Sequence, residues 1–341
     1  MKIGVDILSG EKPKDELLKG CIDALLENKD IEIALIGKKD TFDSILNSKN
    51  DQFFVKNSYV YNRISIIEAS EIITMDDDPL KVVKTKKDSS IIKGLYAHKN
   101  KEIDAFFSPG NTGALVLSSV LVLGRIKNIK KPALAAPMPN TEGKANILLD
   151  VGASAQCEID DYIKFAIMGK IYAEEILGIN NPRIALLNIG EESHKGTSTI
   201  KEVYKRLANL NINFIGNIEG RDIFGNIADV IVCDGYMGNI ALKTAEGAVN
   251  AVSKLLKNSI KNNILASLSI PLYYGAIKQL KNRLNPDKYG GVPLLGINGN
   301  VFKGHGNSGR EAIKYGILTA ANVIYHDIIG KINNRIKEIE F

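Results

Sequence analysis

The feature that most constrains the fold of this chain is a pattern that recurs along it: a short apolar run, a turn that contains glycine, and a segment with helical spacing. Lys2–Leu8 and Asp15–Glu27 form the first such unit, and Ala105–Phe107 and Thr112–Gly124 form another. Strands that alternate with helices in this way favour a mostly parallel sheet covered by helices on both faces. The sequence therefore predicts an α/β protein.

The composition fits one globular domain. The 341 residues are 45% hydrophobic, enough for a sizeable core, and the length allows one large domain or two closely packed ones. No linker, repeat or low-complexity tract divides the chain. We therefore expect a single domain over residues 1–341, with a helical hairpin that leaves it at about 250–284. The net charge of +5 does not by itself indicate nucleic-acid binding and would suit an anionic substrate or an acidic partner.

Cysteines, histidines and apolar runs bear on the compartment and on cofactors. Cys21, Cys157 and Cys233 are far apart and stand among apolar residues, so we expect buried, reduced thiols and a reducing compartment. The four histidines show no metal-ligand spacing, and neither a metal nor a cofactor is expected. No basic leader and no run near the roughly 20 apolar residues of a membrane span is present, which predicts a cytoplasmic protein.

Four turns draw attention because each follows an apolar strand and precedes a helix. They are Ser108–Gly113, Gly152–Ser154, Gly190–Gly196 and Asp234–Asn239. Glycine lets backbone N–H groups approach a ligand, and a helix start offers unpaired donors with a partial positive charge. In parallel sheets, ligands collect at the carboxyl ends of strands. These turns predict a site for an oxyanion such as phosphate.

Common nucleotide and hydrolase fingerprints are missing. There is no G-x-x-x-x-G-K-[ST], no G-x-G-x-x-G after the first strand and no G-x-S-x-G, which disfavours a P-loop NTPase, a nicotinamide enzyme and an α/β-hydrolase. Lys195, inside a glycine-bounded loop, suits a phosphate partner, although a solvated surface lysine is an equal alternative. His305 lies between two glycines after the expected strand Gly299–Phe302 and suits an oxyanion donor or an acid or base.

The order of motifs resembles the phosphate acyltransferase family from about Lys2 to about Ala312. The resemblance rests on G-N-T-G-A at 110–114, L-D-V-G-A at 149–153, C-D-G-Y-M-G-N at 233–239, L-K-T-A-E-G at 242–247 and L-N-P-D-K-Y-G-G at 284–291. It implies a three-layer αβα sandwich related to isopropylmalate dehydrogenases and phosphotransacetylases. It also implies transfer of a long-chain fatty acyl group from acyl carrier protein to inorganic phosphate, giving acyl phosphate for phosphatidic acid synthesis. A homodimer, peripheral membrane association and no cofactor are implied as well.

The resemblance also assigns roles to residues. The catalytic group would be Lys195, Asp234, Asn239 and His305. The phosphate and substrate would be held by Ser108, Gly110, Asn111, Thr112, Gly113, Gly152, Ser154, Gly235 and Gly238. For Asp234, a helix N-cap is the structural alternative. The first turn departs from the family pattern D-x-M-G-G-D, because Ser9 and Glu11 replace a glycine and an aspartate. A glycine in the family at this position raises the concern that Ser9 is strained by a backbone that needs positive φ.

Surface segments suggest partners. In residues 255–284, Leu256, Ile260, Ile264 and Leu268 share a helical face, which predicts packing on the protein itself, on a dimer mate, on a membrane surface or on the acyl chain. Leu80–His98 is expected to be one helix with a basic face. Its lysines at 81–93, and those at 278–283, are candidate docking patches for acidic acyl carrier protein. The rival hypotheses are a phosphotransacylase that uses acyl-CoA and a non-catalytic acyl- or phosphate-binding relative.

Overall fold

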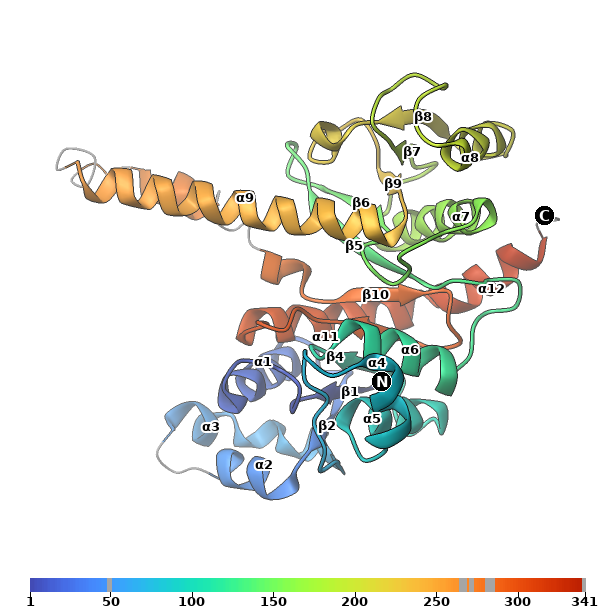
Figure 1. Cartoon of the computed structure of the whole chain (residues 1–341). Coiled ribbons are helices and arrows are strands. Elements are labelled where there is room, and N and C mark those ends of the chain that lie inside the picture. The colour runs from blue at the N-terminus through green and yellow to red at the C-terminus, as the bar shows by residue number, and fades with distance from the viewer. Residues whose placement is uncertain (48–50, 264–268, 270–272, 280–285, 339–341) are drawn as a thin grey trace.

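The computed structural model describes residues 1–47, 51–263, 269, 273–279 and 286–338. Within these residues, eleven strands form one central sheet (Figure 1). The strands are β1 (Lys2–Asp6), β2 (Glu32–Gly37), β3 (Ile64–Glu68), β4 (Ala105–Ser108), β5 (Ala133–Pro139), β6 (Ala145–Leu149), β7 (Ile184–Leu187), β8 (Phe214–Ile218), β9 (Val230–Val232), β10 (Val292–Leu295) and β11 (Val301–Lys303).

The helices follow the strands as the sequence pattern predicts. They are α1 (Lys14–Glu27), α2 (Lys39–Leu46), α3 (Gln52–Lys56), α4 (Pro79–Thr85), α5 (Ser90–Lys99), α6 (Thr112–Val122), α7 (Ile159–Ile176), α8 (Ser198–Ala208), α9 (Gly235–Lys261), α11 (Arg310–Tyr325) and α12 (Ile328–Glu338). Short 3-10 helices lie at Ser58–Arg63, Gly220–Asp222 and Pro286–Tyr289.

The sheet is mostly parallel, as expected. Its strand order is β3-β2-β1-β4-β11-β10-β5-β6-β9-β7-β8. The pairings β10 with β11, β10 with β5 and β5 with β6 are antiparallel, and the other pairings are parallel. Each antiparallel pairing reverses direction. The strands β6, β9, β7 and β8 therefore run opposite to β1, β2, β3, β4 and β11.

This reversal corrects one expectation about the site. The turns after β6, β7 and β9 open at one end of the sheet, whereas the turn after β4 opens at the other, because these strands run in opposite directions. The four glycine turns thus do not share a single sheet edge. The loop after β11 joins the β4 side instead, since Lys303 of β11 pairs with Ser108 of β4.

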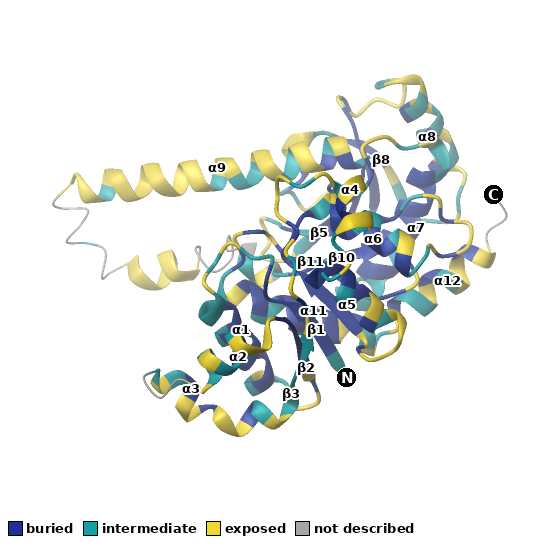
Figure 2. Ribbon diagram, turned by 60° about the horizontal axis from the view of Figure 1, so that its bottom comes forward, coloured by how far each residue is buried: buried dark blue, intermediate teal, exposed yellow. Residues whose placement is uncertain are grey.

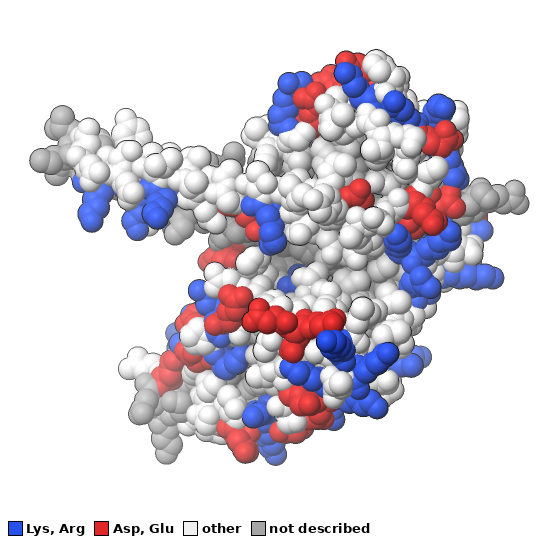
Figure 3. Space-filling model, viewed as in Figure 1, with Lys and Arg blue, Asp and Glu red and all other residues white. Residues whose placement is uncertain are grey.

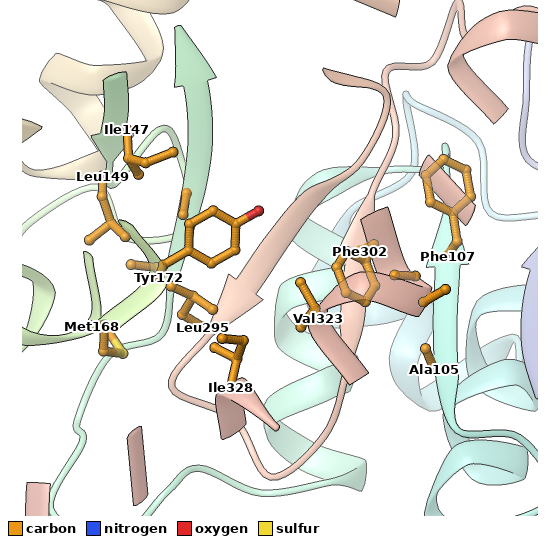
Figure 4. Close-up of a cluster of buried hydrophobic side chains, with 14 of the residues drawn as sticks. Ala105, Phe107, Ile147, Leu149, Met168, Tyr172, Leu295, Phe302, Val323 and Ile328 are labelled. Carbon is orange, nitrogen blue, oxygen red and sulfur yellow. The ribbon is translucent and has the colours of Figure 1, made fainter. Parts of the chain in front are cut away.

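Two buried clusters show that helices cover both faces of the sheet. One cluster packs side chains of α1, α7, α8, α11 and α12 against one face, and the other packs α4, α5 and α6 against the opposite face, with part of α9. Figure 4 shows part of the first cluster: Phe302 of β11 lies beside Val323 of α11, with Phe107 of the neighbouring β4 on its other side, and Tyr172 of α7 lies near Leu295. The three-layer αβα sandwich is confirmed.

One expected helix is two. α4 ends at Thr85 and α5 begins at Ser90, because the intervening residues turn the chain. The carboxylate of Asp88 in this turn accepts hydrogen bonds from the backbone N–H and the hydroxyl of Ser70, at 2.9 and 2.5 Å. These bonds tie the turn to Ser70. An aspartate side chain that bonds to backbone in this way favours a turn over a continuous helix.

The long helix α9 begins in the body of the protein and extends away from it (Figures 1 and 2). Beyond its first turns the helix is largely exposed, and Val252, Leu255 and Leu256 expose 63, 67 and 50% of their surface. Residues 273–279 form a further helical segment, in which Tyr273 and Tyr274 are also exposed. Ile264 and Leu268 of the predicted apolar face lie outside the described residues. No helix in the described ranges is long and apolar enough to span a bilayer.

Candidate active site

A cleft lies beneath the first half of α9, facing strands β5 and β10 and the loop after β11, where the surface is hollowed (Figure 3). Its volume is about 540 Å³, within the usual range for small-molecule sites. We call it the α9 cleft. Its apolar lining includes Leu134, Ala136, Met138, Val151, Phe224, Leu242, Val249 and Val292. Its polar lining includes Thr112, Asn239, Lys243, Glu246, Asp287, Lys303, His305, Asn307 and Ser308.

The polar residues of α9 form a stripe along the cleft. Asn239, Lys243, Glu246 and Asn250 follow one another at intervals of four, three and four residues, so they lie on one face of the helix. Leu242 and Val249 lie beside this stripe and belong to the apolar lining. One helix therefore presents both a polar and an apolar strip to the same cleft.

Asp234 starts the helix that carries this stripe. Its Oδ1 accepts a hydrogen bond from the backbone N–H of Met237 at 2.7 Å, and its Oδ2 accepts one from the hydroxyl of Tyr162 at 2.9 Å. Burial, and after it the charge of Asp234, raises the pKa of Tyr162 well above its ordinary value, which keeps the phenol a donor. The N-cap alternative is therefore what the structure contains, and Asp234 does not line the cleft.

The loop after β6 is folded around a buried carboxylate. Asp150 is fully buried, and its oxygens accept hydrogen bonds from the backbone N–H groups of Leu134, Gly152, Ala153 and Ser154 at 2.8–3.1 Å. Burial raises the pKa of Asp150 to about 6, against the effect of these donors. Asp150 thus acts as the internal support of the loop.

Of the two predicted binding residues in this loop, only one reaches the cleft. Gly152, at φ +130°, lines it and lies against Asn239, whose side chain would be 3.5 Å from a Cβ built on this glycine. Ser154 is buried and its hydroxyl donates to the carbonyl of Pro132 at 3.2 Å, so it holds the loop. Gly235 and Gly238 are buried where α9 packs on the same loop and do not line the cleft.

The loop after β4, with the sequence S-P-G-N-T-G, uses its polar side chains internally. The hydroxyl of Ser108 donates to Asp6 at 2.7 Å and accepts from the N–H of Gly110 at 3.1 Å. The amide of Asn111 donates to three carbonyls of residues 74–77, and its oxygen caps α6 by accepting from Ala114. These partners leave neither side chain facing the α9 cleft.

Thr112 is the residue of this loop that lines the cleft. Gly113 does not line it and packs against Pro79, whose Cγ would lie 2.8 Å from an added Cβ. Of the residues that were predicted to hold phosphate in this loop, only Thr112 lines the cleft, through its hydroxyl.

The loop after β11 contributes more than the sequence indicated. The ammonium of Lys303 donates to the carbonyl of Pro109 at 3.3 Å and to that of Gly304, so it ties the loop after β4 to the loop after β11. Burial, followed by the positive charge of Lys243, lowers the pKa of Lys303 to about 8. The hydroxyl of Ser308 is buried and has no partner among the described residues.

His305 lines the cleft opposite α9 and is exposed. Its Nδ1 accepts a hydrogen bond from the backbone N–H of Asn307 at 3.1 Å, which leaves the proton of the neutral ring on Nε2. Nε2 lies 4.0 Å from a carboxylate oxygen of Glu246 on α9. The imidazole thus faces the polar stripe of α9 with a donor.

Lys195 does not belong to the residues that line the α9 cleft. It lies in the loop between β7 and α8, half-buried, and its aliphatic stem passes within 3.1 Å of the place of a Cβ on Gly190. Its backbone is held by Asn188, which donates to the Lys195 carbonyl at 3.2 Å. The predicted catalytic group is therefore only partly assembled in one chain, with Asn239 and His305 in the cleft.

The altered first turn contacts the loop after β11, which lines the cleft. The backbone N–H of Glu11 donates to the carbonyl of Gly306 at 3.0 Å, and the hydroxyl of Ser9 lies 3.2 Å from that of Ser90. Ser9 does not have a positive φ, so the concern raised by the glycine-to-serine departure is unfounded. The turn does not line the cleft.

Sequence reasoning missed Lys243, Glu246, Lys303 and Ser308 as cleft residues. A signal for two of them was present, because Lys243 and Glu246 stand four and seven residues after Asn239 within one expected helix. Lys303 stands beside the glycines that flank His305, after an expected strand, which is the same pattern that singled out Lys195, although it was not among the predicted site residues. Ser308 had no such pattern. Within the residues that the structure describes, no cluster of His, Cys, Asp or Glu could hold a metal ion.

Comparison with known proteins places the chain in a family. The profile of the family described as "Fatty acid synthesis protein" matches residues 1–331. A phosphate acyltransferase of Caldanaerobacter subterraneus subsp. tengcongensis is 41% identical over 337 residues, covering 99% of this chain and 98% of the relative. One of Clostridium tetani is 40% identical over 340 residues, covering 100% and 99%.

Solved structures show the same fold. A phosphotransacetylase from Streptococcus pyogenes superposes with a TM-score of 0.60 at 16% identity, covering 95% of this chain and 94% of the other. A branched-chain phosphotransacylase from Enterococcus faecalis gives 0.55 at 16% identity, covering 95% and 99%. The relatives match along nearly their whole length, and the chain belongs to the phosphate acyltransferase family.

Proposed function

We propose that this protein transfers a long-chain fatty acyl group from acyl carrier protein to inorganic phosphate. The product, acyl phosphate, would serve phosphatidic acid synthesis. The observation that carries the proposal is the α9 cleft, in which an apolar wall from β5 and α9 lies beside two lysines and several hydrogen-bond donors. An acyl thioester and a phosphate dianion need those two environments next to each other.

The chemistry requires little beyond placement and charge stabilisation. A phosphate oxygen attacks the thioester carbonyl, and the tetrahedral intermediate then collapses as the carbon–sulfur bond breaks. A thiol pKa near 8.5 makes the thiolate a good leaving group. Most of the rate would come from orientation and from donors aimed at the developing oxyanion.

Asn239 and His305 are the predicted catalytic residues that the cleft supports. The amide of Asn239 sits at the start of the polar stripe and suits an oxyanion donor. The Nε2–H of His305 suits donation to an oxygen or to the departing sulfur. Asp234 would act through α9 as a positioning residue. Lys195 keeps its proposed role from the family resemblance, at the edge of the neighbouring β7–α8 loop.

Partners follow from exposed surfaces. The apolar side chains of α9 and residues 273–279 would be covered by a second copy of the chain or would touch a membrane surface, as the family resemblance implies. The lysines of α4 and α5 would meet acidic acyl carrier protein. Acyl transfer should then slow as salt screens the encounter.

A hydroxylamine-trapping assay tests the reaction. Acyl phosphate should form from long-chain acyl carrier protein only when inorganic phosphate is present. Faster formation from acyl-CoA would favour the rival phosphotransacylase, and no product from either donor would favour a non-catalytic relative. Lys195→Ala belongs in the same assay, since undiminished activity would remove Lys195 from the mechanism.

A further inference from the structure

Two lysines line the α9 cleft from opposite sides. Lys243 comes from α9, and Lys303 ends strand β11 beneath it. They interact strongly enough that Lys243 contributes to the lowered pKa of Lys303. Two like charges that line one cleft repel each other, and an anion between them offsets that repulsion.

Lys303 is held in place by two hydrogen bonds and keeps a third N–H donor. Its ammonium donates to the carbonyls of Pro109 and Gly304, and a lysine has three N–H donors. The two backbone carbonyls fix the position of the charge without neutralising it. The negative charges of Asp6 and Glu11 raise its pKa, as weaker influences than burial and Lys243.

A second, independent feature adjoins this lysine pair. Ser308 exposes 1% of its surface, its hydroxyl has no partner among the described residues, and the residue lines the cleft. Helix α11 begins immediately after it, at Arg310, with Gly309 as an N-cap that has no side chain to satisfy the first N–H groups. Gly304 packs between the ring of Phe107 and this hydroxyl, because a Cβ there would lie 2.5 Å from Phe107 and 3.3 Å from the hydroxyl oxygen.

We propose that the phosphate substrate binds on the α11 side of the cleft, between Lys303 and Lys243, with donors from Ser308 and the start of α11. This inference rests on the proposed function, since it takes inorganic phosphate as the co-substrate. It moves the anion away from Ser108 and Asn111, whose side chains are engaged within the protein. Thr112 also lines the cleft that contains this proposed phosphate position.

The proposed position also suits the reaction. Asn239 stands one helical turn before Lys243 on the same face of α9, so a carbonyl held by Asn239 would lie next to phosphate held by Lys243. A phosphate oxygen could then attack that carbon, while the acyl chain follows the apolar wall of β5. The departing thiolate would leave toward the open side of the cleft.

Calorimetric titration with inorganic phosphate tests the subsite without any acyl donor. Lys243→Gln and Ser308→Ala should each weaken phosphate binding about tenfold, because each removes one hydrogen bond to a charged ligand. In the hydroxylamine-trapping assay the KM for phosphate should rise by the same factor, while the KM for the acyl donor stays unchanged. Lys243 is exposed, so its substitution should not disturb folding.

Matched controls come from the same chain. Ser118→Ala removes another buried hydroxyl, on α6 and outside the cleft, that has no partner in the described part of the chain. Lys254→Gln removes a charge from the exposed outer part of α9. Both should bind phosphate as the wild type does. Equal binding by wild type, Lys243→Gln and Ser308→Ala would overturn the inference, as would a loss confined to Lys195→Gln or a wild type that binds no phosphate. Phosphate binding with the expected losses but no acyl phosphate from any donor would leave the subsite standing and reject the proposed reaction.

Discussion

Gly238 in the first turn of α9 packs directly on the main chain of Asp150, and a Cβ at Gly238 would overlap the Asp150 carbonyl oxygen. The same carbonyl accepts from the thiol of Cys233 at 3.3 Å. This contact joins the loop after β6 to the helix that carries Asn239. Gly238 is therefore a packing glycine, and its effect on the site is to set where α9 starts.

Gly238→Ala should destabilise the fold and displace Asn239. Overpacking a tight contact against backbone costs about 1–3 kcal/mol, since the main chain cannot yield as a side chain can. We expect a lower urea midpoint together with a lower rate of acyl phosphate formation. Gly247→Ala on the same helix meets nothing within 4 Å and should instead be neutral or stabilising by up to about 1 kcal/mol. Equal stability of the two variants would contradict the packing role.

Lys303 predicts a pH dependence of phosphate use. In the phosphate-free protein its pKa is about 8, below its ordinary value, owing to burial and to Lys243, with Asp6 and Glu11 acting in the opposite direction. The ammonium is charged below pH 8 and loses its proton as the pH rises through 8. Between pH 7 and 9 the charged fraction falls about tenfold, so the KM for phosphate should rise by about that factor.

The control for this dependence is Lys303→Arg. A guanidinium stays charged throughout this range, so the KM of the variant should not follow the same rise. Initial rates at varied phosphate between pH 6.5 and 9.5, with the acyl donor saturating, provide the measurement. A flat KM in the wild type, or the same rise in the arginine variant, would separate Lys303 from phosphate binding.

The sequence anticipated the layers of the fold better than the order of its strands. The spacing of apolar residues along the chain is a local signal that shows which strands and helices are buried. A sheet covered by helices on both faces follows from that signal. The net reversal of the sheet comes from the antiparallel pair β5–β6, whose two segments the sequence indicated as strands joined by a turn. The strand order also depends on β10, a four-residue strand that contains Pro293 and was not expected, and that pairs antiparallel with both β11 and β5. A short apolar run with a proline gives a weak strand signal. Its pairing with β11 and β5 is a long-range contact, which local periodicity does not reveal.

The same distinction applies to the site. Asn239, His305, Thr112 and Gly152 were predicted as functional residues, and they line one cleft. Ser108 and Asn111 stand in an equally suggestive motif, yet they bond to their own backbone and to Asp6. Short polar side chains in turns serve either purpose, and only the three-dimensional partners decide between them.

The departures in the first turn should matter little for catalysis. Ser9→Gly removes a side chain that is not strained, so it should cost stability of about 0.5–1 kcal/mol through added chain entropy and leave the rate within about twofold. The backbone bond from Glu11 to Gly306 remains in this variant. Denaturant unfolding and the trapping assay measure the two effects. A rate increase of tenfold or more would show that Ser9 limits turnover.

Asp234 offers a test that separates positioning from direct chemistry. Both of its oxygens have partners within the protein, Met237 and Tyr162, and it does not line the cleft. Asparagine caps helices about as well as aspartate, whereas alanine loses the cap at a cost of about 1 kcal/mol. Asp234→Asn should therefore keep its activity within about threefold, and Asp234→Ala should lose both stability and rate as the start of α9 loosens. Comparing kcat, the KM for phosphate and the thermal midpoint of the two variants distinguishes the roles. The amide oxygen retains the cap, but the variant loses the charge and the acceptor for the Tyr162 hydroxyl. An Asp234→Asn enzyme that folds normally but has lost its kcat would therefore make the carboxylate part of the reaction beyond its role as a helix cap.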